Sequence, residues 1–125
     1  MAETLLYVDD DPLRLEVITA RLRLLGYEVL TAANGPDALA LFNQQERLDL
    51  AVVDYYMPGM SGDLVAMEIK TRRPELPVII FSGLFTLSEM VVAFVDGFVS
   101  TSDDPDALLD KIADVLKPRR AARAS

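Results

Sequence analysis

Apolar residues along the chain form two kinds of pattern, short continuous runs and stripes at helical spacing. The runs have the length of buried strands and end at turn residues, which predicts strands at 4–8, 27–32, 48–54, 77–81 and 97–100. The stripes predict helices at 11–26, 34–42, 64–73, 86–95 and 104–116. Strands that alternate with helices in this way favour an α/β fold, with a parallel sheet covered by helices on both faces.

Parallel strands joined by right-handed crossovers allow few strand orders. A common doubly wound order is 2-1-3-4-5, in which the chain changes direction between the first and third strands. The loops after these two strands border the crevice where open α/β sheets bind ligands. We therefore predict a five-stranded, doubly wound parallel sheet with five helices, and a site at the ends of the strands 4–8 and 48–54.

The first predicted helix has clear end signals. Asp11 is a good N-cap, Pro12 suits the first helical position, and Gly26 offers a left-handed C-terminal stop. Between them an apolar stripe consists of Leu13, Val17, Ala20 and Leu24, widened by Ile18, Leu22 and Leu25. We expect this stripe to pack on the sheet.

Composition excludes several classes of protein. The 125 residues include no cysteine and no histidine, which excludes thiolate or imidazole metal sites and a Ser/His/Asp triad. No apolar run approaches the ~20 residues that span a bilayer, and the N-terminus lacks a signal-peptide pattern, so a cytoplasmic protein without membrane contact is expected. The length suits one domain, which we assign to residues 1–117.

Charge is distributed unevenly along the chain. The net charge is −8, but four of the twelve basic residues follow residue 116, so that residues 1–116 carry eight basic against twenty acidic groups. Such a body repels nucleic acid, and no direct nucleic-acid binding is expected. The basic segment 118–125 has no helical periodicity and is predicted to be a flexible tail or linker.

Aspartates follow two of the predicted strands. Asp9 and Asp10 come directly after the first, and Asp54 ends the third, before a loop rich in proline and glycine. Taken separately, each group can be explained as a turn or helix cap. Together, three carboxylates suit a hard cation such as Mg²⁺, and their mutual repulsion should raise at least one pKa. A carboxylate can also act as a nucleophile and form an aspartyl phosphate.

Four motifs occur at the predicted strand ends: Val8-Asp9-Asp10, Asp54 with the loop through Gly62, Ser82-Gly83, and Gly97-Phe98-Val99. As a set they resemble the receiver domain of bacterial two-component response regulators, over essentially the whole chain. The resemblance implies the flavodoxin-like receiver fold. It also implies that Asp54 is the phosphoacceptor, that Asp10, Asp54 and the Tyr56 carbonyl bind Mg²⁺ or Mn²⁺, and that Asp9 contributes through water.

The same resemblance implies a switch and partners. Ser82 would move toward the phosphoryl group, and Phe98 takes the place of the aromatic switch. A sensor histidine kinase or phosphotransfer protein would supply the phosphoryl group, and a target protein or output domain would respond. The face of the fourth helix, fifth strand and fifth helix would carry the signal, and a homodimer could form there. Such a domain is no enzyme beyond self-catalysed phosphotransfer and slow autodephosphorylation, in which Tyr56 and Leu84 would flank the path of the attacking water.

One departure from the family concerns a fixed cation. The family carries a lysine at the end of the fifth strand, usually before a cis proline, where this chain has Thr101 and Ser102. The lysines of the chain, Lys70, Lys111 and Lys117, are predicted on or at the ends of helices away from the site. Arg14 could partly compensate, although we favour a solvated surface arginine. Without the lysine, the domain could alternatively be a degenerate receiver that binds proteins independently of phosphorylation.

Two other classes fit less well. An aspartyl-nucleophile phosphatase of the haloacid dehalogenase kind needs a second aspartate two residues after the first, and Tyr56 stands there. A flavodoxin-like cofactor binder needs a loop rich in glycine or threonine to hold phosphate, and the predicted loops have no such composition.

Overall fold

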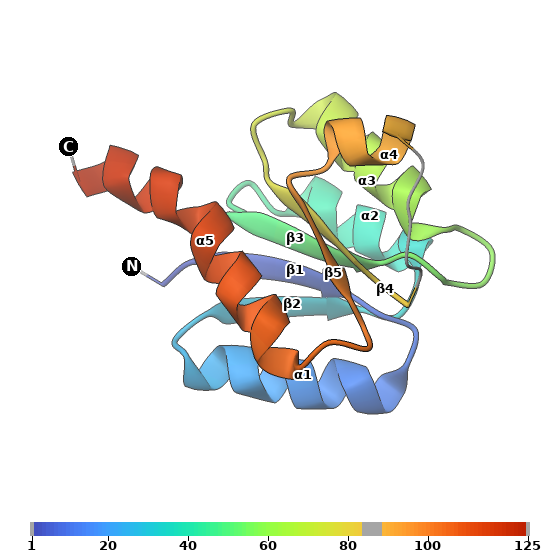
Figure 1. The fold of residues 1–125 in the computed structure, drawn as a ribbon. Helices are drawn as coiled ribbons and strands as arrows, with labels where there is room; N and C mark the ends of the chain where they lie inside the picture. Colours follow the sequence, from blue (N-terminus) through green and yellow to red (C-terminus); the bar gives the residue numbers. More distant parts are fainter. Residues whose placement is uncertain (1, 84–88, 125) are drawn as a thin grey trace.

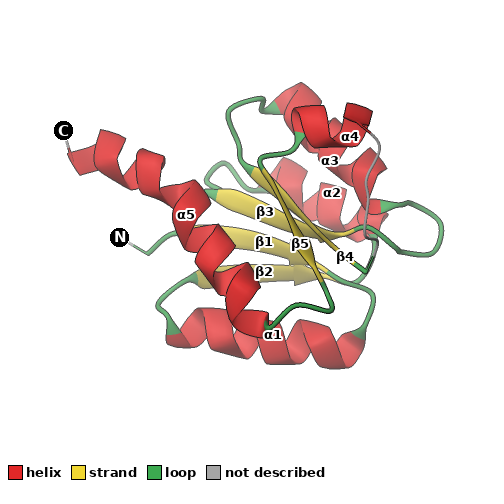
Figure 2. Ribbon diagram, viewed as in Figure 1, coloured by secondary structure: helices red, strands yellow, loops and turns green. Residues whose placement is uncertain are grey.

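A computed structural model describes residues 2–83 and 89–124, and it has a parallel five-stranded sheet between two layers of helices (Figures 1 and 2). The strands are β1 (Thr4–Val8), β2 (Glu28–Ala32), β3 (Leu50–Asp54), β4 (Val78–Ser82) and β5 (Gly97–Ser100). The helices are α1 (Pro12–Leu24), α2 (Gly35–Gln44), α3 (Gly62–Arg72), α4 (Glu89–Phe94) and α5 (Pro105–Ala124). The strand order β2-β1-β3-β4-β5 confirms the predicted doubly wound sheet.

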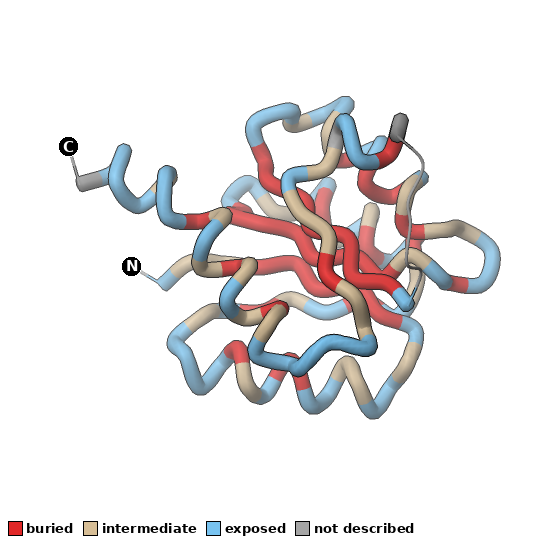
Figure 3. The backbone as a smooth tube through the Cα atoms, in the orientation of Figure 1, coloured by how far each residue is buried: buried red, intermediate tan, exposed pale blue. Residues whose placement is uncertain are grey.

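The sheet separates two apolar cores. On one face, residues of α2 and α3 such as Phe42 and Ile69 pack against alternate side chains of the strands. On the other face, α1 and α5 contribute Leu22 and Ile112. The central strands are buried along nearly their whole length, as Figure 3 shows, because helices cover both of their faces. None of the helices within the described ranges is long and apolar enough to cross a bilayer.

The register of the strands aligns their carboxyl ends at one edge. Val8 lies between Ala32 of β2 and Val53 of β3, and Asp54 pairs with Phe81 of β4. The first residues after β1 therefore lie next to the last residue of β3. This juxtaposition is the crevice that the strand order predicts.

The ends of α1 are as predicted, but its buried face is not. The side chain of Asp11 accepts hydrogen bonds from the amides of Leu13 and Arg14, and Gly26 has a positive φ of 95°. The predicted stripe is largely exposed, with Leu13 70% and Leu24 87% accessible, whereas Ile18 and Leu22 are buried. Because α1 carries apolar residues around most of its circumference, spacing alone did not identify the face that packs on the sheet.

The C-terminal helix is longer than the sequence predicted. An irregular segment was expected from residue 118, but α5 continues through Pro118 to Ala124. Its last turns are held by ion pairs to the amino-end edge of the sheet, where Arg123 and Arg119 reach Asp49 and Arg120 binds Glu3. These contacts offset the hydrogen bond that a proline removes from a helix interior.

The region after β4 is described only in part. A helix was predicted for 86–95, and α4 occupies Glu89–Phe94 of it. Leu84, proposed from the resemblance to flank the path of water, lies outside the described residues.

Candidate functional site

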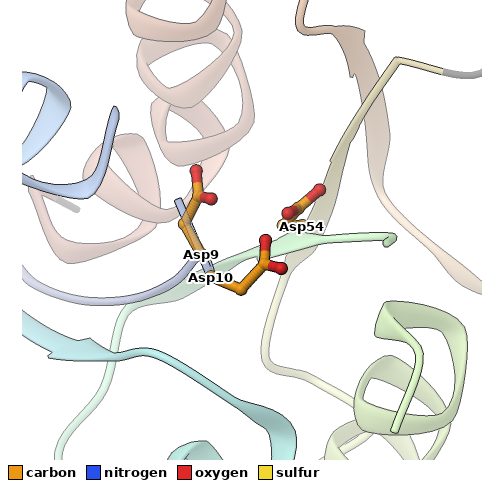
Figure 4. A group of neighbouring side chains, drawn as sticks. All are labelled: Asp9, Asp10 and Asp54. Atoms are coloured by element: carbon orange, nitrogen blue, oxygen red, sulfur yellow. The ribbon is translucent and has the colours of Figure 1, made fainter. Parts of the chain in front are cut away.

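Three aspartates meet at the carboxyl ends of β1 and β3 (Figure 4). Asp9 and Asp10 follow β1 directly, and Asp54 is the last residue of β3. One carboxylate oxygen of each lies within 4.8 Å of the others. Asp9 and Asp54 are buried, and Asp10 is exposed. The structure thus brings together the three carboxylates that the sequence singled out.

Asp9 is held by hydrogen-bond donors on both of its carboxylate oxygens. The hydroxyl of Tyr7 donates to Oδ2 over 2.6 Å, and the amide of Asp11 donates to Oδ1 over 3.0 Å. Arg14 contacts both oxygens, with Nε 2.7 Å from Oδ2 and Nη2 3.0 Å from Oδ1. Burial and the hydrogen bond to Asp9 raise the pKa of Tyr7, so its hydroxyl remains a neutral donor. Four protein donors fill the acceptor positions of this carboxylate.

Arg14 is a member of the site, and its interpretation as a solvated surface residue was wrong. Its Nη2 lies 3.3 Å from Oδ2 of Asp54, in addition to the two contacts with Asp9. Its guanidinium carbon lies 5.6 Å from the centre of the Phe81 ring, and its side chain is 29% exposed. The hydrogen bonds to Asp9 raise the pKa of Arg14, so it is a permanent cation between the two buried aspartates.

The surroundings of Asp54 disfavour its ionised form. Burial first, and then the charge of Asp9 and the hydrogen bond and charge of Asp10, raise the pKa of Asp54 to about 7, while Arg14 acts to lower it. A carboxylate that is costly to ionise beside two others gains from any cation that can neutralise it. The predicted rise of at least one pKa in this cluster is found at Asp54.

The loop after β3 is fixed by a close backbone contact. The amide of Gly62 donates to the carbonyl oxygen of Tyr55 over 2.8 Å. A Cβ at Gly62 would lie 2.2 Å from the carbonyl oxygen of Asp54, so only glycine fits there. Tyr56 is 58% exposed and lines the pocket above Asp54. The loop thereby places Tyr56 at the pocket that Asp10 and Asp54 also line.

The far side of the pocket is formed by the ends of β4 and β5. Ser82 is buried, and its carbonyl accepts a hydrogen bond from the amide of Thr101 over 2.8 Å. Thr101 lines the same pocket as Asp54 and Arg14. Phe98 pairs with Ile80 two residues earlier along the strands and packs, half-buried, on the α2–α3 core. Ser82 and Phe98 therefore project from the same face of the sheet, at different distances from the pocket.

Two of the lysines are engaged at the opposite edge of the sheet, as the sequence predicted. Lys70 pairs with Asp96 over 2.9 Å and donates to the carbonyls of Pro74 and Leu76. The side chain of Lys111 lies against Gly97, the first residue of β5. Neither reaches the carboxylates at the strand ends.

Sequence reasoning missed Tyr7, did not assign a role to Gly62, and considered Arg14 as a compensating cation but favoured a solvated surface residue. Tyr7 lies on β1 two residues before Asp9, and strand alternation extended one residue past Val8 could have indicated that contact. Gly62 was recognised only as part of the loop motif. The direction of the Arg14 side chain is a tertiary property, because a residue in the first turn of a helix can turn either to solvent or back across the cap.

The donor set fits a hard divalent cation. Oxygen ligands from one or two carboxylates, a backbone carbonyl and waters suit Mg²⁺. Asp10 is exposed beside the buried Asp54, and burial first, then the neighbouring carboxylates, raise the pKa of Asp54, so a cation would stabilise its ionised form. Because protein donors already occupy the acceptor positions of the Asp9 carboxylate, Asp9 is better placed to act on a metal through water than directly.

The sequence matches the response regulator receiver domain family over residues 5–113. The transcriptional regulatory protein GlrR of Escherichia coli is 37% identical over 116 residues, which cover 90% of this chain and 26% of GlrR. The chain thus spans about a quarter of the length of that relative. Its similarity concerns one part of a longer protein.

Solved structures show the same architecture. The response regulator TrrA of Thermotoga maritima, determined in complex with Mg²⁺ and BeF, is 33% identical, with a TM-score of 0.85 over 91% of this chain and 99% of TrrA. TrrA has also been determined in complex with the histidine kinase ThkA, and this form is 34% identical with a TM-score of 0.83, over 91% of this chain and 98% of TrrA.

Proposed function

The chain belongs to the response regulator receiver domain family, whose members are Mg²⁺-dependent phosphoacceptors of two-component signalling, and on that premise we propose that Asp54 is its phosphoacceptor. The convergence of Asp9, Asp10 and Asp54 within 4.8 Å carries this assignment. Asp54 is the member of the cluster that ends a central strand, is buried, and has a pKa raised to about 7. The strand fixes the position of Asp54, and its raised pKa means that its ionised form is stabilised by a nearby cation.

The reaction is a transfer between two nucleophiles. A carboxylate oxygen of Asp54 attacks the phosphorus of a phosphohistidine, the new P–O bond forms as the P–N bond breaks, and the imidazole leaves and takes up a proton from solvent. Asp54 must be ionised to attack, so the reaction is favoured above its pKa. Asp10, Asp54 and the Tyr56 carbonyl would hold Mg²⁺ or Mn²⁺, with Asp9 acting through water. The metal would neutralise charge on the acyl phosphate.

The donor is proposed to be a sensor histidine kinase or a phosphotransfer protein in the cytoplasm. The similarity to TrrA, which was determined bound to the kinase ThkA, supports this. The α1 helix begins at the pocket and exposes Leu13 and Val17 to solvent, which leaves an apolar surface beside Asp54 for a partner. Asp10 and Tyr56 line the pocket above Asp54 and are exposed, and a donor would approach Asp54 from that side.

The readout is proposed to run through β4 and β5. Ser82 lies at the end of β4, the strand next to the one that Asp54 ends. Phe98 projects from the same face of the sheet as Ser82. Movement of Ser82 toward a phosphoryl group would alter the packing of Phe98. The face of α4, β5 and α5 would then bind a target protein or output domain, or a second copy of the chain.

Phosphoryl uptake provides the test. The protein is incubated with Mg²⁺ and acetyl phosphate, and intact mass is measured for wild type and Asp54→Asn. One added phosphoryl group in wild type and none in Asp54→Asn supports the assignment. No addition in either, with Mg²⁺ binding intact, would favour a receiver that binds proteins without phosphorylation.

A further inference from the structure

Arg14 occupies a position that helix electrostatics disfavour. It is the third residue of α1, where the partial positive charge of the helix N-terminus repels a cation. Its side chain nevertheless lies across the cap, with less than a third of it exposed. The contacts that hold it there are the two hydrogen bonds to Asp9, the bond to Asp54 and the face of Phe81. Its placement is therefore explained by the acidic pocket and not by the helix.

Arg14 is also the basic side chain of the pocket. Of the described residues that line the space above Asp54, three are acidic, Asp10, Asp11 and Asp54, and Arg14 alone is basic. Thr101, on the opposite wall, is neutral. A phosphoryl group on Asp54 would add negative charge to this space, and its oxygens need charged donors. The guanidinium presents several N–H groups in a planar fork that suits phosphate oxygens.

We propose that Arg14 is the permanently charged cation of this phosphoryl site, a role that rests on the proposed function of Asp54. In the metal-free protein its guanidinium pairs with both Asp9 and Asp54. When a metal ion neutralises the aspartates, the guanidinium is released to donate to the phosphoryl oxygens on Asp54. Its Nη2 is already 3.3 Å from Oδ2 of Asp54, so a rotation of the side chain is sufficient.

Two opposite effects of one substitution follow from this role. Arg14 and a divalent cation are attracted by the same carboxylates, so Arg14→Gln should bind Mg²⁺ several-fold more tightly. Arg14→Gln should also lose a charge-assisted contact to the phosphoryl group and be phosphorylated roughly tenfold to a hundredfold more slowly. A purely structural role of Arg14 would instead weaken both metal binding and phosphorylation, because both depend on an intact pocket.

The experiment compares four proteins: wild type, Arg14→Gln, Arg14→Lys and the control Arg21→Gln. Arg21 lies on the same helix and pairs with Asp106, away from the pocket. Mg²⁺ affinity is measured by titration calorimetry, binding of beryllofluoride with Mg²⁺ as a non-covalent mimic of the phosphoryl group, and phosphorylation by acetyl phosphate from intact mass. We expect tighter Mg²⁺ but weaker beryllofluoride binding and slower phosphorylation in Arg14→Gln, partial recovery in Arg14→Lys, and wild-type values in Arg21→Gln.

A lysine on the opposite wall gives a second test, in which a new cation is added both with and without Arg14. Thr101→Lys should accelerate phosphorylation of the Arg14→Gln variant much more than that of wild type, because wild type already has a cation. Equal acceleration in both backgrounds would overturn the role of Arg14, as would wild-type rates in Arg14→Gln. If wild type itself takes up neither acetyl phosphate nor beryllofluoride, the proposed function of Asp54 fails instead.

Discussion

Removing the charge of Asp54 should stabilise the metal-free protein at alkaline pH. Asp54 is 3% exposed, and its pKa is raised from the ordinary 3.8 to about 7, by burial first and then by Asp9 and Asp10. The folded state therefore binds this proton more tightly than the unfolded state does. The resulting stabilisation is complete below about pH 4 and is lost as the pH rises to about 7. Asp54→Asn carries no charge to bury and escapes this loss.

The shift sets the size of the effect. A pKa difference of about three units corresponds to roughly 4 kcal/mol between the protonated and ionised forms. At about pH 8 the free energy of unfolding of metal-free Asp54→Asn should exceed that of wild type by up to this amount, and near pH 4 the two should be similar. Excess Mg²⁺ should reduce or reverse the difference at pH 8, because it stabilises the ionised carboxylate.

Urea denaturation in EDTA across this pH range measures the difference directly. Asp114→Asn is a suitable control, because Asp114 is an exposed residue of α5 far from the pocket. Its difference from wild type should be small and vary little with pH. If metal-free wild type is as stable as Asp54→Asn at about pH 8, the account of Asp54 as an ionised residue under strain is wrong.

Three further outcomes are expected. Mg²⁺ at one hundred times its dissociation constant should raise the free energy of unfolding of wild type by ~2.7 kcal/mol. In a thermal melt, Asp10→Asn should abolish most of that gain. Gly62→Ala should lower the free energy of unfolding by about 3 kcal/mol or more, because the added Cβ meets the backbone of Asp54, and it should also weaken Mg²⁺ binding. Gly59→Ala, at a φ of 85° in open space, should lose only ~1–2 kcal/mol and keep the metal. Tyr56→Asn should shorten the lifetime of the Asp54 phosphate after donor removal, since an amide can orient the attacking water, and an unchanged decay rate would exclude steric protection by Tyr56.

Local signals in the sequence were sufficient for the fold and for the acidic cluster. The apolar runs place all five strands to within about two residues, and parallel strands must bring Asp9, Asp10 and Asp54 to one edge once their order is known. Asp11 and Gly26 mark the ends of α1 through their own backbone chemistry.

What the sequence could not indicate depends on contacts between distant segments. The spacing of apolar residues in α1 did not determine which face of the helix is buried, because the exposed Leu13 and the buried Leu22 are equally apolar. Pro118 favoured an end to α5, and only the contacts of the arginines beyond it with Asp49 and Glu3 explain why the helix continues. Arg14 is the same case within the site, since its role follows from where three carboxylates lie around it.

The strand β3 has a buried carboxylate at each end, Asp49 just before it and Asp54 as its last residue. Burial raises the pKa of Asp49, but hydrogen bonds from the Thr4 amide and from Arg123 lower it below its usual value, whereas the pKa of Asp54 is raised. Arginines of α5 surround Asp49, and aspartates crowd Asp54. The charged groups around β3 therefore differ between its two ends, with arginines at Asp49 and a cluster of carboxylates at the pocket. The carboxylates at the pocket favour the approach of a cationic surface to that end of the strand, and a phosphoryl group on Asp54 would add to their negative charge.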